Sequence, residues 1–123
     1  MTEPGFFLLY VDNLAISSEF YAAMLGKLPV AASSSFSLFE LRCGARLGLW
    51  ARTSVQPAAS IAGGACELGI ALEDEAEVDR CHAAWQARGL CIIQQPTDMV
   101  LGRTFVALDP DGHRLRVFAP GTT

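Results

Sequence analysis

The chain has few positive charges, and they form no basic stripe. Nine Lys and Arg residues stand against thirteen Asp and Glu residues, so the net charge is −4 at pH 7. A protein that binds nucleic acid needs clustered cations to neutralise phosphates. We therefore expect no nucleic-acid partner and, for the same reason, no binding to an anionic membrane surface.

Long apolar runs are missing as well. No stretch approaches the roughly 18–20 residues that a membrane-spanning helix needs. The opening residues, Met1 to Pro4, are acidic rather than basic, unlike a secretory signal. The 123 residues suffice for one domain and are too few for two ordinary ones. Because 51% of the residues are hydrophobic, a sizeable core can be buried.

Histidine is scarce, and the cysteines lack the spacing of a metal site. There are two histidines, and no two of the four cysteines have the C-x-x-C spacing of a zinc or redox site. We expect reduced, partly buried thiols and hence a cytoplasmic protein, with disulfide pairing as the alternative. The cysteines are Cys43, Cys66, Cys81 and Cys91.

The first half of the chain changes from a strand pattern to a helix pattern and back. An apolar run ends at a polar turn, and a stretch with helical spacing then ends at Gly26, a helix stop signal. Asn13 or Asp12 is expected to cap this helix. The predicted strands are Phe6–Val11, Phe36–Arg42 and Ala45–Ala51, the last two joined by a turn at Cys43-Gly44, and the predicted helix is Leu14–Leu25.

The second half repeats this order after a linker at residues 52–65, which is rich in Ser, Ala, Gly and Pro. A helix with an acidic first turn again follows a strand, and a hairpin closes around the turn Asp109-Pro110-Asp111-Gly112. The predicted strands are Cys66–Leu72, Leu90–Gln94 (ended by Pro96), Arg103–Leu108 and Arg114–Phe118, and the predicted helix is Asp74–Arg88. The repeat predicts a single α+β domain, residues 1–123, with modules at 5–51 and 66–119.

Motifs at both ends resemble the vicinal oxygen chelate superfamily of glyoxalases, bleomycin resistance proteins and dioxygenases. The motif residues are Val11–Leu14, Glu19–Tyr21, Leu25–Gly26, Gly102–Phe105 and Asp109–His113. Further matches are similar to the phenazine antibiotic resistance branch of that superfamily. They are Leu9–Val11, Leu49-Trp50, Glu67–Ile70, Thr97-Asp98 and Arg116-Val117.

This resemblance implies the architecture. Each module would be βαβββ, a curved mixed sheet with a helix on its convex side and half of a cleft on its concave side. Two chains would pair as a homodimer, often with exchanged modules. Members of the phenazine branch bind a planar aromatic drug in a cleft at the dimer interface and sequester it without a metal.

The resemblance also indicates where enzymes of the superfamily hold a divalent metal. Three of those strand positions fall on Phe6, Glu67 and Arg116. Phe6 has no donor atom and Arg116 is a permanent cation, so one possible ligand remains. We therefore predict no metal and no cofactor. The histidines are expected in structural roles, His82 on a helix surface and His113 at a turn.

The apolar wall of the cleft is predicted from strand alternation. Phe6, Leu8 and Tyr10 share one face of their strand. Trp50 is expected to stack on a planar ring, a role that the resemblance favours over ordinary core packing. Phe39 is included in the site although the face of its strand is left open.

The polar part of the cleft is predicted around one arginine. Arg116 is expected to pair with Glu67 or to meet a carboxylate of the guest. Met99, in a loop at the cleft mouth, would adapt to a flat guest, whereas Trp85 is expected in the helix core. The predicted ligand-binding set is Phe6, Leu8, Tyr10, Phe39, Trp50, Glu67, Met99 and Arg116.

Covalent catalysis finds no support, because no Ser or Cys lies in a nucleophile elbow and no group is placed to orient a histidine base. The sequence therefore predicts a non-enzymatic protein that binds and sequesters a small planar aromatic compound. Two alternatives stay open. One is a metal-dependent glyoxalase- or dioxygenase-type enzyme whose ligands lie elsewhere, and the other is a protein-binding or scaffold module.

Overall fold

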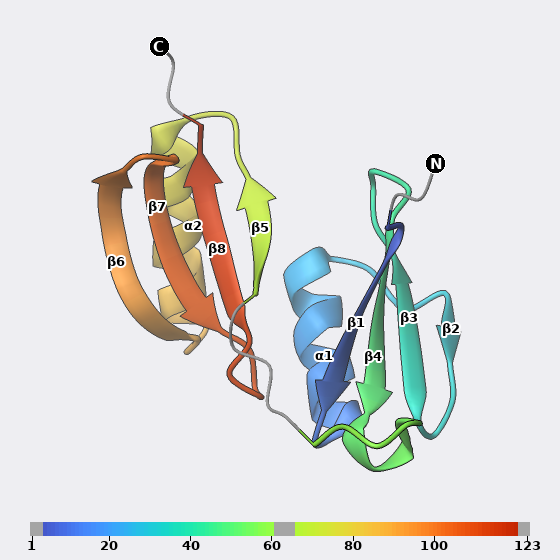
Figure 1. The fold of residues 1–123 in the computed structure, drawn as a ribbon. Helices are drawn as coiled ribbons and strands as arrows, with labels where there is room; N and C mark the ends of the chain where they lie inside the picture. Colours follow the sequence, from blue (N-terminus) through green and yellow to red (C-terminus); the bar gives the residue numbers. More distant parts are fainter. Residues whose placement is uncertain (1–3, 61–65, 121–123) are drawn as a thin grey trace. The chain divides into compact units, whose positions relative to one another are not determined.

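A computed structural model describes residues 4–60 and 66–120. The chain divides into two compact units, unit 1 (Met1–Ala62) and unit 2 (Gly63–Thr123). Figure 1 shows that each unit consists of one four-stranded sheet with one helix against it.

Unit 1 has the order strand, helix and three strands. Its sheet runs β1-β4-β3-β2, with β1 parallel to β4 and the other neighbours antiparallel. The elements are β1 (Phe6–Val11), α1 (Leu14–Leu25), β2 (Ala31–Ala32), β3 (Phe36–Glu40) and β4 (Arg46–Ala51), followed by the short 3-10 helix η1 (Arg52–Ser54). The predicted linker thus begins with η1, and its residues 61–65 lie outside the described residues.

Unit 2 repeats this arrangement. Its sheet runs β5-β8-β7-β6, with β5 parallel to β8 and the other neighbours antiparallel. The elements are β5 (Glu67–Ala71), α2 (Glu75–Ala87), β6 (Cys91–Met99), β7 (Gly102–Leu108) and β8 (Arg114–Ala119). The same connectivity and strand order in both units confirm the predicted α+β fold of two βαβββ modules.

Local capping explains where both helices begin and where α1 ends. The side chain of Asn13 accepts a hydrogen bond from the backbone N–H of Ile16 at 3.1 Å, and Gly26 ends α1 with a φ of 68°. The side chain of Asp74 accepts from the N–H of Glu77 at 2.8 Å. Each cap satisfies a backbone donor that the first helical turn leaves unpaired.

Each helix covers one face of its own sheet and buries a core there. The side-chain hydroxyl of Ser18 on α1 donates to that of Ser37 on β3 at 3.1 Å, which identifies the covered face of unit 1. The buried apolar residues of unit 1 include Val11, Tyr21, Phe39, Leu47 and Leu49, and those of unit 2 include Val78, Trp85, Phe105, Leu115 and Val117.

The core of unit 2 contains two aromatic contacts from α2. The rings of Trp85 and Phe105 lie 5.4 Å apart, so Trp85 is in the core as expected. The ring of His82 lies 5.3 Å from the same Phe105. Its Nε2 is buried and has no hydrogen-bond partner among the described residues. His82 therefore faces the sheet, and the expected helix-surface role is wrong because the α2 stripe that packs on β7 is wider than the sequence pattern suggested.

The strand β6 runs further than predicted. It continues through Pro96 to Met99, although Pro96 was expected to end it. β6 is an edge strand, and its pairing with β7 shifts register between Gln94 and Thr97. A proline, which has no backbone N–H, is tolerated at an edge or a bulge. Met99 is consequently the last residue of a strand rather than part of a loop.

The turn between β7 and β8 is organised by Asp109, whose side chain is buried. Its Oδ1 accepts from the backbone N–H groups of Asp111 and His113, at 2.9 and 2.8 Å. Its Oδ2 lies 2.6 Å from Nδ1 of His113, and Gly112 has a φ of 85°. His113 thus holds the turn role that the sequence predicted.

The cysteines are all free thiols. Cys43, Cys66 and Cys91 are exposed, whereas Cys81 on α2 is half-buried. The expectation of partly buried thiols therefore holds only for Cys81, because the other three lie at a turn or at strand starts. Among residues 4–60 and 66–120, no helix is both long and apolar enough to span a bilayer.

Candidate functional site

The face of the unit 1 sheet opposite α1, called here the aromatic face, carries most of the predicted apolar site. Register and alternation define its members. They are Phe6, Leu8 and Tyr10 on β1, Arg46, Gly48 and Trp50 on β4, and Phe36, Leu38 and Glu40 on β3. Phe6 is 54% exposed and Leu8 45%, so about half of each residue is uncovered, and the guanidinium of Arg46 lies over the Phe6 ring at 5.7 Å from its centroid. The predicted grouping of Phe6, Leu8 and Tyr10 is the one that the register gives.

Trp50 lies between two other rings on the aromatic face. The ring of Tyr10 meets it at 6.3 Å with an interplanar angle of 81°, and that of Phe36 at 6.2 Å and 77°. Both are edge-to-face arrangements, which the ring quadrupoles favour. Trp50 is half-buried, so its indole is held in position while part of it stays accessible.

Gly48 lets the side chains around it close over the strand. A Cβ at this position would lie 2.7 Å from Cδ2 of Leu8 and 2.8 Å from Cζ of Phe36. These two side-chain ends therefore occupy the space that any other residue would fill. In the middle of the aromatic face, the side chains of Leu8 and Phe36 therefore lie directly over the β4 backbone.

Phe39 does not belong to this face. It is fully buried on the covered side of β3, among the core residues under α1. Phe36 and Leu38 occupy the alternate positions of the same strand. The sequence therefore placed the wrong phenylalanine of β3 in the site, and Phe39 is unavailable to a ligand on the aromatic face.

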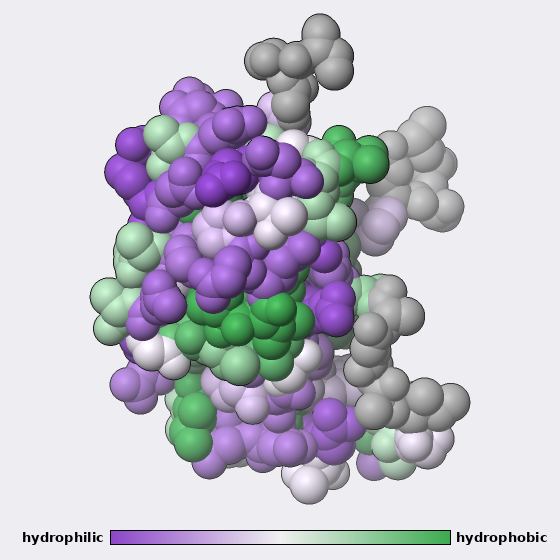
Figure 2. All heavy atoms as spheres, turned by 90° about the vertical axis from the view of Figure 1, so that its left-hand side faces the viewer, coloured by the Kyte–Doolittle hydropathy of each residue, from purple (hydrophilic) through white to green (hydrophobic). Residues whose placement is uncertain are grey.

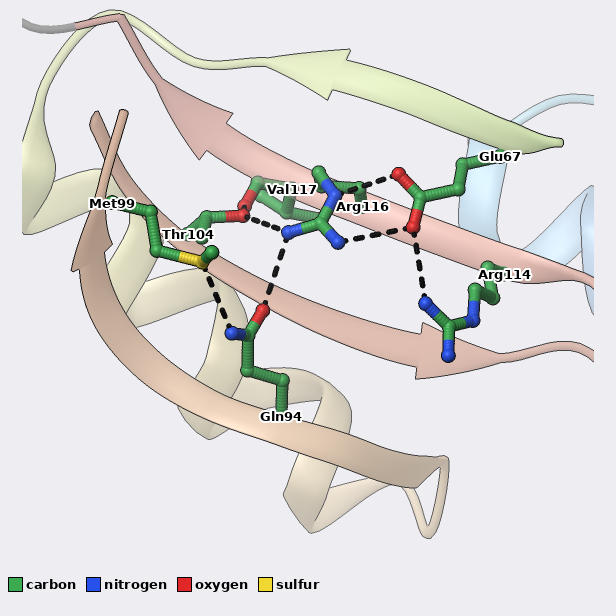
Figure 3. A network of polar contacts seen from close by, with 7 residues as sticks. All are labelled: Glu67, Gln94, Met99, Thr104, Arg114, Arg116 and Val117. Carbon is green, nitrogen blue, oxygen red and sulfur yellow. Dashed lines mark hydrogen bonds and ion pairs between the residues drawn. The ribbon is translucent and has the colours of Figure 1, made fainter. Parts of the chain in front are cut away.

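The face of the unit 2 sheet opposite α2, called here the polar face, is organised by Arg116. Its Nε and Nη2 donate to the two carboxylate oxygens of Glu67, at 2.7 and 3.0 Å. Its Nη1 donates to Oε1 of Gln94 at 3.2 Å and to Oγ1 of Thr104 at 3.3 Å. Figure 3 shows these side chains converging over β7 and β8 beside the curved β6. Of the two roles predicted for Arg116, pairing with Glu67 is the one present.

Two further side chains extend this network. The amide nitrogen of Gln94 donates to the sulfur of Met99 at 3.2 Å, so Met99 joins the predicted polar site through Gln94. At the other end, Nη1 of Arg114 lies 3.5 Å from Oε2 of Glu67. Figure 3 shows Arg114 and Gln94 on opposite sides of the central ion pair.

The electrostatics of the polar face follow from these contacts. The hydrogen bond from Arg116, with a weaker contribution from Arg114, holds the pKa of the Glu67 carboxyl below its ordinary value. The same contact raises the pKa of Arg116. Glu67 is therefore ionised at neutral pH and committed to two guanidinium groups.

The residues present do not fit a metal centre. Of the three positions where the resemblance predicted metal ligands, Phe6 offers no donor and Arg116 is a cation. The third, Glu67, already binds two arginines. Within residues 4–60 and 66–120, no group of three His, Cys, Asp or Glu side chains is gathered where it could hold a metal ion.

Sequence reasoning missed several members of both faces. On the aromatic face these are Phe36 and Gly48, and on the polar face Gln94, Thr104 and Arg114. Alternation along β8 places Arg114 beside Arg116 and was available as a signal. The others depend on which strands become neighbours, which periodicity does not give.

The side of the molecule that carries β6 is mostly hydrophilic around a compact apolar patch (Figure 2). The end of the β6–β7 hairpin exposes apolar side chains as well. Met99 is 50% exposed there and Val100 fully exposed. Met99 therefore combines a polar contact to Gln94 with an accessible apolar surface.

Comparison with known proteins agrees with this fold. A family model, the Glyoxalase/Bleomycin resistance protein/Dioxygenase superfamily, matches residues 4–117. The chain belongs to this superfamily. Among curated members, it is similar to the phenazine antibiotic resistance protein EhpR of Enterobacter agglomerans, with 32% identity over 93% of this chain and 89% of that protein.

Two solved structures extend the comparison. A protein of Agrobacterium tumefaciens, solved by NMR in solution, is 51% identical, with a TM-score of 0.90 over 99% of this chain and all of that one. A glyoxalase-related enzyme of Fulvimarina pelagi has a TM-score of 0.84 at 21% identity, covering 97% and 88% of the two chains. The latter likeness concerns the fold alone.

Proposed function

We propose that this superfamily member binds a planar aromatic compound of the phenazine type and sequesters it, without metal and without chemistry. The proposal includes a homodimer, with the ligand clefts at the interface between the two copies. The observation that carries it is the aromatic face, on which Trp50 is held edge-on by Tyr10 and Phe36.

The aromatic face has the chemistry that a flat ring system needs. Exposed Phe6 and Leu8 offer apolar area, and the side chains of Leu8 and Phe36 pack over Gly48 as a continuous apolar surface. Burying about 150–250 Å² of apolar ring surface contributes roughly 4–6 kcal/mol, and favourable ring contacts add about 0.5–1.5 kcal/mol. A micromolar dissociation constant corresponds to a binding free energy of about −8 kcal/mol, which apolar burial and several ring contacts together can supply.

Two further observations support binding rather than catalysis. The donor set of a metal-dependent enzyme is replaced by Phe6 and by the Glu67–Arg116 pair. The curated relative at 32% identity is named for phenazine antibiotic resistance. Sequestration works by mass action, so it requires affinity and abundance but no reacting group.

The test uses the two tryptophans as a matched pair. Trp50 lies on the aromatic face, whereas Trp85 is buried under α2. Titrating neutral phenazine into Trp85→Phe protein should quench the fluorescence of Trp50 saturably. The same titration of Trp50→Phe protein should give little quenching and a dissociation constant about tenfold weaker by calorimetry. Light scattering of the wild type tests the homodimer.

The proposal fails if phenazine and related planar rings produce no saturable quenching in the wild-type protein. Equal quenching in the two variants would also contradict it, because the ligand would then not lie at Trp50.

A further inference from the structure

The aromatic face carries one cation, Arg46. This residue is exposed, and in the strand register it stands opposite Phe6 of β1 on one side and Glu40 of β3 on the other. Its guanidinium lies over the ring of Phe6, at 5.7 Å from the ring centroid, a distance at which a cation is attracted to a ring face. The positive charge is therefore directed toward β1.

The neighbouring carboxylate does not pair with this charge. Oppositely charged side chains that stand across from each other on adjacent strands attract, and Glu40 has that position relative to Arg46. Arg46 nevertheless forms neither an ion pair nor a side-chain hydrogen bond with any residue that the structure describes. Because Phe6 and Glu40 lie on opposite sides of β4, the guanidinium over Phe6 is turned away from Glu40. Its N–H groups are thus available to an acceptor on a ligand.

The placement of Arg46 relative to Trp50 fits a flat ligand. The two residues are four positions apart on the same face of β4, so their Cα atoms are separated by about 13 Å along the strand. The side-chain ends of Leu8 and Phe36 lie between them, over Gly48. A fused ring system that rests on these two side chains has the indole at one end and the guanidinium at the other. All of these groups belong to unit 1.

We propose that Arg46 binds a carboxylate carried by the planar ligand and thereby makes the aromatic face selective for anionic aromatics. A guanidinium presents parallel N–H groups that match the two oxygens of a carboxylate. The contact with Phe6 keeps this charge at the end of the face that is remote from Trp50. The inference rests on the proposed function and deepens it, because it names the class of ligand and the side chain that recognises it.

Glu40 makes an opposite contribution to the same selectivity. Its carboxylate belongs to the aromatic face and repels an anion that approaches Arg46. Removing the charge of Glu40 should therefore strengthen the preference for an anionic ligand, whereas removing the charge of Arg46 should abolish it. Loss of packing at either position would not produce effects of opposite sign.

The test compares two ligands of nearly the same shape, phenazine-1-carboxylate and its neutral carboxamide, by calorimetry at neutral pH and low salt. The wild-type protein should bind the carboxylate about three- to fivefold more tightly, as expected for an accessible ion pair. Arg46→Gln should reduce this ratio to about one, and Arg46→Lys should keep part of it. Glu40→Gln should raise the ratio about twofold. Added salt should lower the ratio in the wild type.

The matched control is Lys27→Gln, which removes an equal charge from unit 1 outside the aromatic face. Lys27 follows α1, and its ammonium donates to the backbone carbonyl of Glu40 at 2.9 Å. This variant should leave the ratio unchanged, which separates a contact at Arg46 from an effect of net charge. Because Arg46 is exposed and has no ion pair within the described part of the chain, Arg46→Gln should fold normally, and circular dichroism checks this.

The outcomes separate this inference from the proposed function. If the wild type binds both phenazines equally, or if Arg46→Gln keeps the full ratio, the inference is overturned while phenazine binding stands. A ratio that falls in Glu40→Gln also contradicts it. If neither compound binds the wild type, the inference and the proposed function fall together. A preference that Arg46→Gln abolishes and Lys27→Gln retains supports the assignment.

Discussion

Glu67 and Arg116 form a bidentate ion pair between the adjacent parallel strands β5 and β8, with N–O distances of 2.7 and 3.0 Å. The two residues occupy positions where the resemblance predicted metal ligands, and their contacts with Gln94, Thr104 and Arg114 make this part of the sheet a hydrogen-bond network. Two of the predictions below, on the stability of unit 2 and on its response to metals, depend on this pair.

Glu67→Gln should destabilise unit 2 in a pH-dependent way. The pKa of Glu67 is lowered in the folded protein, so its stabilising contribution is complete above the ordinary pKa near 4.5 and is lost as the pH falls through the lowered value. Because about a third of the side chain is exposed, we expect a loss of about 1 kcal/mol at pH 7. Urea unfolding at pH 7 and at pH 3 measures it.

The control for this prediction is Glu73→Gln, an exposed glutamate outside the network. The difference between Glu67→Gln and wild type should shrink toward pH 3, whereas Glu73→Gln should match wild type at both values. A Glu67→Gln deficit that is as large at pH 3 as at pH 7 would contradict the linkage.

Gly48→Ala should disturb the aromatic face more than the stability of unit 1. The new Cβ forces the ends of Leu8 and Phe36 aside, but both are side-chain ends that can move. We expect a change of less than about 1 kcal/mol in the free energy of unfolding and a clear shift of the Leu8 methyl signals by NMR. Phenazine affinity should fall about tenfold, because the displaced Leu8 and Phe36 side chains would project further from the sheet.

Gly69→Ala is the matched variant in unit 2. A Cβ at that position meets Cε1 of Phe118 at 3.5 Å, an ordinary van der Waals contact. It should leave the signals of Leu8 unchanged and cost little stability. If Gly48→Ala changes the Leu8 methyl signals as little as Gly69→Ala does, the close packing over β4 is not the reason for a glycine at position 48.

Cys81 should be the least reactive of the four thiols. Burial raises the pKa of its thiol, and the thiolate is the form that attacks an electrophile. At pH 8 we expect alkylation of Cys81 to be about tenfold slower or more than that of exposed Cys43, measured by peptide mass spectrometry after a short pulse. Equal rates at the two sites would mean that α2 opens faster than the reagent reacts.

Divalent metals should leave the folded protein unchanged. Because Glu67 is committed to two arginines, adding Ni²⁺, Mn²⁺ or Zn²⁺ should move the melting temperature by less than about 1 °C. Thermal unfolding with and without a chelator measures this. A rise of several degrees that the chelator removes would favour the metal-dependent enzyme instead.

Local patterns in the sequence specify much of this molecule. The period-two run in β1 places Phe6, Leu8 and Tyr10 on one face, and Asn13 and Gly26 mark the ends of α1 through their capping chemistry. These features depend on neighbours within a few residues, so the chain order alone reveals them.

Other features depend on which strands become neighbours and which face the helix covers. Alternation separates Phe36 from Phe39, but only the packing of α1 decides that Phe39 is buried. Pro96 remains in a strand because β6 is an edge strand whose pairing with β7 shifts register. Arg114 is the more accessible cation because the guanidinium of Arg116 is hydrogen-bonded to residues 12 to 49 positions away in the chain. Such relationships are set by long-range pairing, and no local pattern in the chain encodes them.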